Sequence, residues 1–380
     1  MQEERQIADG WVRSGLLEGI HINYQEPPRN VAPFRKLEHK QVAFLLPEAS
    51  PLELEMRNMT PTEQILAIML SKSVRRGKRA LIEPFLGPIR ESIESVVSHQ
   101  QPISFILPTL PFKDQSPFVT GAAIDHVDLS EYAFFAQLKR ILQAIKKVYT
   151  PGAHITLLCD GFIYADIFAN NDKDGAGRYK ARCEKIKNAY ELYNEVTLFD
   201  MREVLFDMPE WTRIETAIQE VVRRLYQDDA STKERLDTLA RRFVFHVAIP
   251  NLSYEEARVI YLRSSWPNWI LEKLLDAAIK YSALQLTLKK TQLVKRAFPS
   301  AIRCTVHPKA APQLPLHLTN LRNQLLPYNG VATISRQAQT ASQSLFQSLR
   351  IKRLCDIFEY ENVIAVRAEN LKDPIYYELP

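Results

Sequence analysis

The cation Lys113 stands in a proline-rich segment, residues 107–121, that directly follows an apolar run. The run, residues 103–107, predicts a buried strand, and Pro108 and Pro111 come after it. Because each proline fixes φ and removes a backbone donor, we expect a rigid loop. A rigid loop at the end of a strand suits a side chain that must be held toward a ligand. If the protein is an enzyme, its active site is expected to include this loop, with Lys113 facing an anionic ligand.

Three acidic residues lie at the ends of predicted helices or strands, two at the start of a helix and one after a strand. Asp128 and Glu131 begin an amphipathic helix predicted over residues 130–149, in the positions of a capping box. That capping role does not exclude a functional one, because the pair lies where the proline-rich loop ends. Asp160 follows a second buried strand, residues 154–159, and the carboxyl ends of parallel strands line the ligand crevice of open α/β sheets. The alternative for Asp160, a simple Asp-Gly turn, stays open.

Further candidate residues occur late in the chain. Residues 302–309 alternate apolar and polar side chains, so Arg303 and His307 share a face of a predicted strand, with Thr305 between them. Arg303 can fork onto phosphate or carboxylate, and His307 titrates near neutrality. A purely structural histidine is the alternative. The dipeptide Tyr328-Asn329 forms a predicted turn before another strand.

The sequence lacks the motifs of several familiar sites. Glycine is scarce, 11 in 380 residues, and neither a G-x-G-x-x-G fingerprint nor a P-loop occurs. The eight histidines include no H-E-x-x-H, and the four cysteines include no C-x-x-C. Residues 170–175 resemble the start of a calcium loop, but position twelve is Ala181 rather than glutamate, so a solvated turn before a helix is favoured. We expect no metal and no cofactor, and any phosphate must be held by side chains or a helix N-terminus.

The order of the predicted elements indicates the fold class. Strands and helices alternate over residues 61–210, which predicts an α/β domain with a Rossmann-like, mostly parallel sheet flanked by helices. Residues 1–60 contain several prolines and predict an N-terminal arm. Residues 211–300 predict a helical insertion, and residues 301–380 predict a C-terminal β-rich part that completes the site.

Three local patterns make narrower predictions. Thr60 and Glu63 predict a capping box at the start of a helix. Residues 243–249, FVFHVAI, fit a strand or a buried helix, and periodicity does not decide between them. Residues 354–360 predict a strand of the β-rich part.

Composition narrows the class of partner. The hydrophobic share of 46% and the charged share of 24% are ordinary for a folded protein. A net charge of +5 suits anionic small molecules and is too small to predict a nucleic-acid partner. No apolar run of about 18 residues predicts a membrane span, and the acidic, polar first residues do not resemble a signal peptide. Widely spaced cysteines are typical of a reducing compartment, so we expect a cytoplasmic protein.

Four segments of the chain occur in an order and an approximate spacing that are informative together. They are LPTLPFK at 107–113, LLCDGFIYAD at 157–166, IRCTVHP at 302–308 and PYNGVA at 327–332. Across residues 100–335, these segments resemble the pyoverdine/dityrosine biosynthesis family, the isonitrile (isocyanide) synthases. The positions that match the family's motifs are Lys113, Asp128, Glu131, Asp160, Gly161, Asp166, Arg303, His307, Pro308, Pro327, Gly330 and Val331.

The chain also departs from the family's pattern. Asp114-Gln115-Ser116 replaces Ser-x-Asn, Phe162 replaces an arginine, and Tyr328-Asn329 replaces Trp-His. The chain is therefore identified as a divergent member, and these departures imply a changed substrate or lost chemistry.

The resemblance implies an enzyme of secondary metabolism. Its expected reaction condenses the amino group of tyrosine or tryptophan with ribulose 5-phosphate, whose ketone carbon becomes the isonitrile carbon as the sugar is fragmented, without a redox cofactor. The implied catalytic residues are Lys113, Asp128, Glu131, Asp160 and His307, and the implied substrate-binding residues are Lys113, Arg303, Asp166, Tyr328 and Asn329. Another amine–sugar-phosphate reaction and a non-catalytic small-molecule-binding protein are the alternatives. A homodimer also stays open.

Overall fold

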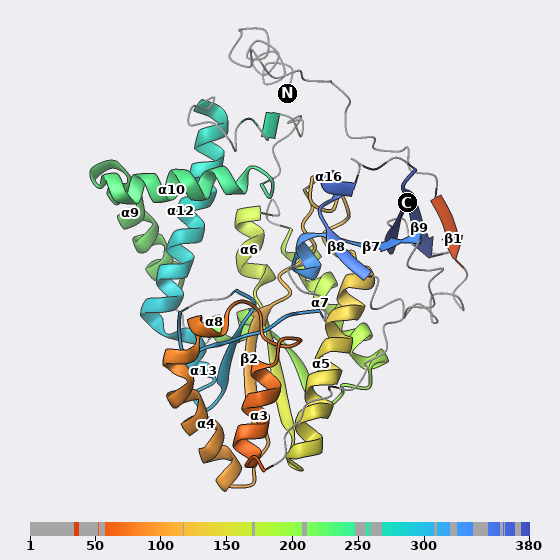
Figure 1. Ribbon diagram of the computed structural model, residues 1–380. Coiled ribbons are helices and arrows are strands. Elements are labelled where there is room, and N and C mark those ends of the chain that lie inside the picture. The colour runs from red at the N-terminus through yellow and green to blue at the C-terminus, as the bar shows by residue number, and fades with distance from the viewer. Residues whose placement is uncertain are drawn as a thin grey trace.

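The structure is a computed structural model of the chain (Figure 1). It describes residues 34–37, 52, 58–116, 118–168, 172–206, 211–247, 256–257, 259, 268–307, 310–319, 325–336, 349–357, 360, 362–368 and 374–380. The predicted N-terminal arm, residues 1–60, lies mostly outside these ranges. Figure 1 shows a sheet wrapped by helices at the bottom, a helical arm above it on one side, and a second sheet above it on the other.

The first sheet is parallel, as predicted. Among the described residues, five strands pair in the order β4-β3-β2-β5-β6. Their bounds are β2 Ile103–Thr109, β3 Ala153–Cys159, β4 Val196–Asp200, β5 Ile302–Thr305 and β6 Leu314–Pro315. The chain runs outward from β2 through β3 to β4 and then returns as β5 on the other side of β2. The strand order therefore reverses between β2 and β5, and open α/β sheets bind their ligands at such a point.

Alternate side chains of the central strands enter two cores, because successive residues of a strand point to opposite faces. Phe105 and Leu107 of β2 pack in the larger core, whereas Ile106 between them packs with Leu158 in the core shared with the helical arm. The helices around the sheet are α3 (Pro61–Leu70), α4 (Leu86–Ser98), α5 (Leu129–Val148), α6 (Gly161–Phe168), α7 (Lys173–Ala189) and α8 (Met201–Phe206), with short 3₁₀ turns at Arg79–Leu81 and Glu83–Phe85.

The strand β2 is longer than the apolar run suggested. It continues through Pro108 to Thr109, in register with Leu158 and Cys159 of β3. Pro108 is accommodated because it lies beyond the short stretch of β2 that also pairs with β5, at residues 105–106.

The helical arm consists of α9 (Trp211–Asp228), α10 (Ala230–Phe243), α12 (Asn268–Thr291) and α13 (Leu293–Ala297). In Figure 1, α12 descends from this arm to the edge of the parallel sheet. The ambiguous segment 243–249 resolves in part: α10 ends at Phe243, residues 244–247 form turns, and residues 248–249 lie outside the described ranges. The turn places His246 against α6, where the centroids of the Phe168 ring and the imidazole are 6.4 Å apart.

Four C-terminal strands and one strand near the N-terminus form the second sheet among the described residues. Within the described ranges its strand order is β1-β9-β10-β7-β8. The bounds are β1 Phe34–Leu37, β7 Val331–Ser335, β8 Leu349–Lys352, β9 Ile364–Ala368 and β10 Tyr376–Leu379, preceded by a 3₁₀ turn at Pro327–Asn329. Strand β5, which was grouped with these C-terminal strands, lies in the first sheet instead.

The prediction of a strand over residues 354–360 is wrong. Its described part forms the helix α16 (Leu354–Ile357). The N–H groups of Leu354 and Cys355 donate to the carbonyl oxygens of Val119 and Phe118, so this segment finds its partners in the loop after β2 rather than in a sheet.

The predicted helix starts are confirmed. Thr60 and Glu63 form a capping box on α3, and Asp128 and Glu131 form one on α5. In the segment that resembled a calcium loop, the Asp172 side chain accepts a hydrogen bond from the Gly175 N–H and caps α7. No helix in the described part of the chain is both long and apolar enough to cross a membrane.

Candidate active site

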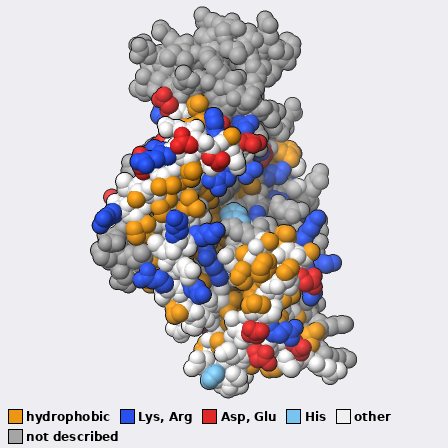
Figure 2. Space-filling model, turned by 90° about the vertical axis from the view of Figure 1, so that its left-hand side faces the viewer, with side chains coloured by type: hydrophobic (Ala, Val, Ile, Leu, Met, Phe, Trp, Pro, Cys, Tyr) orange, Lys and Arg blue, Asp and Glu red, His pale blue; other side chains and the backbone are white. Residues whose placement is uncertain are grey.

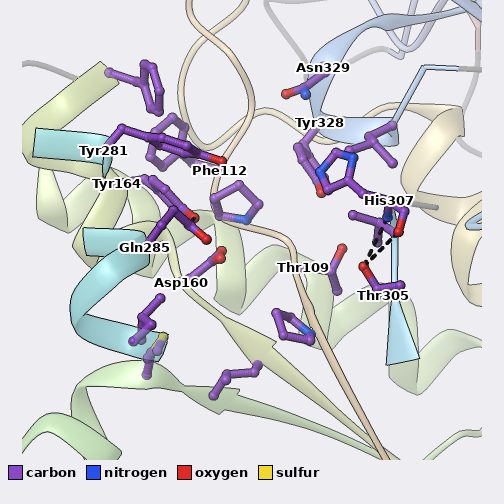
Figure 3. A pocket seen from close by; sticks show the side chains of 18 of the residues that line it. Thr109, Phe112, Asp160, Tyr164, Tyr281, Gln285, Thr305, His307, Tyr328 and Asn329 are labelled. Atoms are coloured by element: carbon purple, nitrogen blue, oxygen red, sulfur yellow. Dashed lines mark hydrogen bonds between the residues drawn. The ribbon is translucent and has the colours of Figure 1, made fainter. Parts of the chain in front are cut away.

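A cavity of about 330 Å³ lies at the carboxyl ends of the central strands. Thr109 ends β2, Asp160 follows β3 and Thr305 ends β5, and all three side chains line the cavity (Figure 3). The cavity therefore lies where the strand order reverses, and its volume is at the lower end of the range of about 300–1,000 Å³ for small-molecule sites.

One wall of the cavity is aromatic and is built by three helices. Tyr164 of α6 stacks on Tyr281 of α12, with ring centroids 5.9 Å apart. Phe243 of α10 presents its edge to Tyr281 at 5.4 Å and to Phe168 at 4.9 Å. The Gln285 amide donates to the Tyr164 hydroxyl at 3.0 Å and fixes its position. Such a wall suits a flat apolar ring, because aromatic rings pack well edge-on or offset against one another.

The opposite wall is polar and comes from β5 and the turn before β7. Arg303, Thr305 and His307, predicted to share a face, all line the cavity, as do Tyr328 and Asn329. The Thr305 hydroxyl donates to the His307 carbonyl and accepts from the His307 N–H, both at 3.1 Å, which holds the turn after β5. Figure 3 shows this wall facing Tyr164, Tyr281 and Gln285 across the cavity.

Asp160 provides an acidic group between the two walls. Its Oδ1 atom is buried and has no hydrogen-bond partner in the described part of the chain. Burial raises the pKa of Asp160 to about 8, and its own backbone N–H offsets only part of that rise. The group is therefore mainly a neutral carboxylic acid at pH 7, able to donate a proton.

The proline-rich loop is pressed against the turn that holds Asp160. A Cβ atom built on Gly161 would lie 1.7 Å from the carbonyl oxygen of Pro111, closer than any two such atoms can approach. Glycine is needed here for this close contact of two backbones. The contact fixes the loop relative to Asp160.

A second hollow, of about 900 Å³, adjoins the cavity. Arg303 and Gln285 line both. The second hollow also has Arg235, Arg242, Lys289 and Lys295 in its lining, with Glu234 as its one acidic lining residue among those described. Figure 2 shows Lys and Arg side chains gathered around the hollow between the helical arm and the sheet domain. This approach to the cavity therefore attracts anions.

A histidine–carboxylate pair also faces the cavity. The Nδ1 atom of His246 lies 2.5 Å from Oδ2 of Asp114. The other oxygen of Asp114, Oδ1, accepts the Ser116 N–H at 2.9 Å, and the Asp114 N–H donates to the Tyr328 carbonyl at 2.9 Å. Both side chains line the cavity. Asp114 was noticed in the sequence only as a departure from the family's pattern, and His246 was missed because no motif spacing involves it.

Lys113 lies outside this cavity, in a buried ion-pair cluster. Its Nζ atom is 3.0 Å from Oδ2 of Asp128 and 3.0 Å from Oε1 of Glu131, and it donates to the Pro327 carbonyl at 2.9 Å. The three charged side chains are at most 1% exposed. The Tyr179 hydroxyl donates to Glu131 at 2.9 Å.

Burial and ion pairing act in opposite directions on the pKa of Lys113 and on that of Glu131. Burial raises the pKa of Glu131 to about 7, although Lys113 opposes that rise. Burial by itself lowers the pKa of Lys113, but the charges of Asp128 and Glu131 outweigh it and raise it. The ammonium is therefore charged and fully enclosed by its acceptors. It joins the loop after β2, the start of α5 and the turn that carries Tyr328.

The structure thus divides the predicted site residues into two groups. Those that line the cavity are Asp160, Arg303, His307, Tyr328 and Asn329. Those that form the buried cluster are Lys113, Asp128 and Glu131. The side chain of Asp166 lies outside the described residues. No group of three or more His, Cys, Asp or Glu side chains that could hold a metal ion is found among the described residues.

Comparison with known proteins relates this geometry to a family. The family model of the pyoverdine/dityrosine biosynthesis proteins matches residues 93–352, which include all the cavity-lining residues. The L-tryptophan isonitrile synthase AmbI1 of Fischerella ambigua is 25% identical over 224 residues, covering 59% of this chain and 67% of that protein. The L-tyrosine isonitrile synthase of Pseudomonas aeruginosa is 26% identical over 251 residues, covering 63% of this chain and 72% of that protein.

A solved structure supports the fold. The crystal structure of the PvcA protein from Pseudomonas aeruginosa superposes with a TM-score of 0.65 at 18% identity, covering 84% of this chain and 100% of that chain. The chain therefore belongs to the pyoverdine/dityrosine biosynthesis family, as a divergent enzyme of the isonitrile synthase kind.

Proposed function

We propose that this enzyme condenses the amino group of tyrosine or tryptophan with ribulose 5-phosphate and converts the ketone carbon of the sugar into an isonitrile carbon. The observation that carries this proposal is the division of one cavity into an aromatic wall and a cationic side, with a protonatable carboxyl between them. Relatives named as tryptophan and tyrosine isonitrile synthases support the same reaction class.

The aromatic amino acid is assigned to the wall formed by α6, α10 and α12. The Tyr164–Tyr281 stack and the Phe243 edge offer apolar faces to an indole or phenol ring. Bound in this way, the amino group of the substrate is directed toward the strand ends, where Asp160 lies.

The phosphate is assigned to the side of Arg303. This guanidinium lies at the junction of the cavity and the second hollow, whose lining carries further cations such as Lys289 and Lys295. Charge-assisted hydrogen bonds from arginine are strong ligands for phosphate. Lys113, the other candidate for this role, has an ammonium enclosed by Asp128 and Glu131, so we assign to it the holding of the Tyr328 turn.

Asp160 is assigned the role of general acid. Condensation of an amine with a ketone passes through a carbinolamine, whose hydroxyl must gain a proton before it leaves as water. A carboxylic acid with a pKa of about 8 holds that proton at neutral pH in a position facing the cavity. His307 on the opposite wall is kept as a further candidate for proton transfer.

The test uses the full-length protein with tyrosine or tryptophan and ribulose 5-phosphate labelled with ¹³C at the ketone carbon. We expect an amino-acid-derived product that shows an isonitrile infrared stretch and carries the label in the isonitrile carbon by mass spectrometry. A labelled product without an isonitrile would point to another amine–sugar-phosphate condensation. No consumption of either amino acid with any pentose phosphate would refute the proposal.

A further inference from the structure

The pair formed by His246 and Asp114 has no part in the roles assigned above, although both side chains line the same cavity as Asp160. The two residues are 132 positions apart in the chain, and their side chains meet at 2.5 Å. The His246 side chain is 35% exposed and that of Asp114 is 10% exposed. The imidazole is thus open to the cavity, while the carboxylate behind it is nearly enclosed.

Asp114 is itself held from several sides. The Ser116 N–H donates to its Oδ1 at 2.9 Å, its own N–H donates to the Tyr328 carbonyl at 2.9 Å, and its carbonyl accepts from the Thr120 hydroxyl. Because Oδ1 is occupied, Oδ2 is directed to the imidazole. Lys113, the neighbouring residue, is anchored in the buried cluster, which further limits movement of the carboxylate.

The position of His246 is fixed as well. It lies in the turn that ends α10, where its N–H donates to the Phe243 carbonyl at 2.9 Å. The Phe168 ring packs against the imidazole in a T-shaped contact with centroids 6.4 Å apart. With Nδ1 bound to Asp114, Nε2 is the ring nitrogen left for a substrate in the cavity. A carboxylate that holds one imidazole nitrogen sets the tautomer and leaves the other nitrogen free to accept a proton.

We propose that His246, oriented by Asp114, is the base that accepts the proton of the substrate ammonium. This inference rests on the proposed condensation. His246 takes one proton from the ammonium, and the freed amine adds to the ketone carbon as a C–N bond forms and the carbonyl π pair moves to oxygen. A proton then passes from nitrogen to that oxygen and gives the carbinolamine. The imidazolium or Asp160 protonates the hydroxyl, the C–O bond breaks, and water leaves together with a protonated imine. If the imidazolium is the donor, His246 is neutral again. If Asp160 is the donor, transfer of the proton from the imidazolium to Asp160 restores both groups, so charge and atoms balance.

The charged groups that face the imidazole have opposing effects. Burial and the nearby Arg353 lower the pKa of His246, but the charge of Asp114 and its hydrogen bond outweigh them and leave the pKa raised above 6.5. The neutral imidazole, whose Nδ1 atom is held by Asp114, is the form that accepts the proton. With Asp160 as the acid, the cavity contains two groups whose environments suit opposite roles.

The test is the pH profile of kcat/KM for isonitrile formation by the wild type, His246→Gln and Asp114→Asn. In the wild type, kcat/KM falls on the acid side as His246 gains a proton. We expect His246→Gln to lose about 10²- to 10⁴-fold in kcat/KM and to lose the acid limb. Asp114→Asn keeps an oxygen for the Ser116 N–H but removes the charge, so its acid limb moves to lower pH by about 1 to 3 units.

The matched control is His154→Gln. His154 bonds the Thr197 hydroxyl at 2.9 Å near the start of β3, at the end of the strand opposite to Asp160, and this variant should keep the wild-type profile. A wild-type acid limb in either His246→Gln or Asp114→Asn overturns the inference while the proposed function stands. If His246→Gln does not fold, the Asp114→Asn profile decides. A wild type that makes no isonitrile overturns the proposed function, and the inference with it.

Discussion

Replacing Lys113 by methionine should destabilise the protein because it removes the cation from a cluster that water does not reach. Methionine preserves most of the side-chain volume, so the main change is the loss of charge. Asp128 and Glu131 are then left facing one another with their cation gone, at most 1% exposed. Breaking a buried ion pair by removal of one partner costs about 3–5 kcal/mol in the free energy of unfolding.

Lys139→Met is the matched control. Lys139 pairs with Glu191 at 3.1 Å, nearly the distance between Lys113 and its partners, but the two side chains are 25% and 75% exposed. An exposed pair of this kind contributes at most about 1 kcal/mol. The two variants therefore remove the same charge from ion pairs of similar length, and the burial of the pair is the main difference.

The cost of Lys113→Met should also grow with pH. Glu131 has a pKa of about 7 in the folded protein and an ordinary value of 4.5 when unfolded, so it contributes stability below pH 4.5 that is lost as the pH rises through 7. Loss of the cation raises the folded pKa further. Above pH 7, the wild type stops losing stability from this group while the variant continues, and the difference widens by up to about 1.4 kcal/mol per pH unit.

The assay is urea unfolding followed by circular dichroism at pH 7 and pH 8. With a denaturant slope of about 3 kcal/mol per M, the midpoint of Lys113→Met should fall by about 1 to 1.7 M, and that of Lys139→Met by about 0.3 M or less. The structural role of Lys113 would be refuted if both variants unfold at the same urea concentration while Lys113→Met alone loses isonitrile formation. That result would return Lys113 to the catalytic group.

Three further variants test the cavity. Asp160→Asn should lower turnover at neutral pH. Its thermal midpoint should fall less than that of the wild type between pH 6 and 8, because a carboxyl with a folded pKa of about 8 and an ordinary value of 3.8 contributes stability that is lost between those two pH values. Gly161→Ala must displace the proline-rich loop, so it should lower the free energy of unfolding by about 1–3 kcal/mol and reduce turnover. Gly177→Ala, whose added Cβ would meet nothing within 4 Å, should change neither quantity. Equal urea midpoints for the two variants would contradict the close contact at Gly161. Arg303→Gln should raise KM for the sugar phosphate about 10- to 100-fold and leave KM for the amino acid unchanged. The control Arg296→Gln, at an exposed residue, should change neither KM. A rise only in KM for the amino acid would reverse the assignment of the two substrates.

Local patterns in the sequence predicted the parallel sheet and the acidic residue at its carboxyl edge. Two short apolar runs separated by an amphipathic helix indicate neighbouring parallel strands, and the carboxyl end of the second run is where Asp160 lies. The alternation around Arg303 predicted that it shares a face with His307, and both line the cavity. These features depend on spacings of a few residues, which a sequence displays directly.

The surroundings of the Lys113 side chain were not predictable from local sequence patterns. The position of Lys113 in the segment after β2 was predicted, although β2 continues through Pro108, and its side chain points into a cluster with Asp128 and Glu131 instead of the cavity. The direction of that side chain depends on the Pro327 carbonyl, more than 200 residues away. The lysine and the acidic pair were expected to act together on a substrate, and in the structure they neutralise one another.

The sequence by itself determined most elements of the parallel-sheet domain, two of the helix caps and the carboxylate after β3, because periodicity and capping act between near neighbours. Tertiary structure alone decided three things: that β5 returns beside β2, that Tyr164, Phe243 and Tyr281 form one wall, and that His246 meets Asp114. Each is a contact between segments distant in the chain. Such contacts are selected by the burial of whole faces against one another, and no local spacing records that choice.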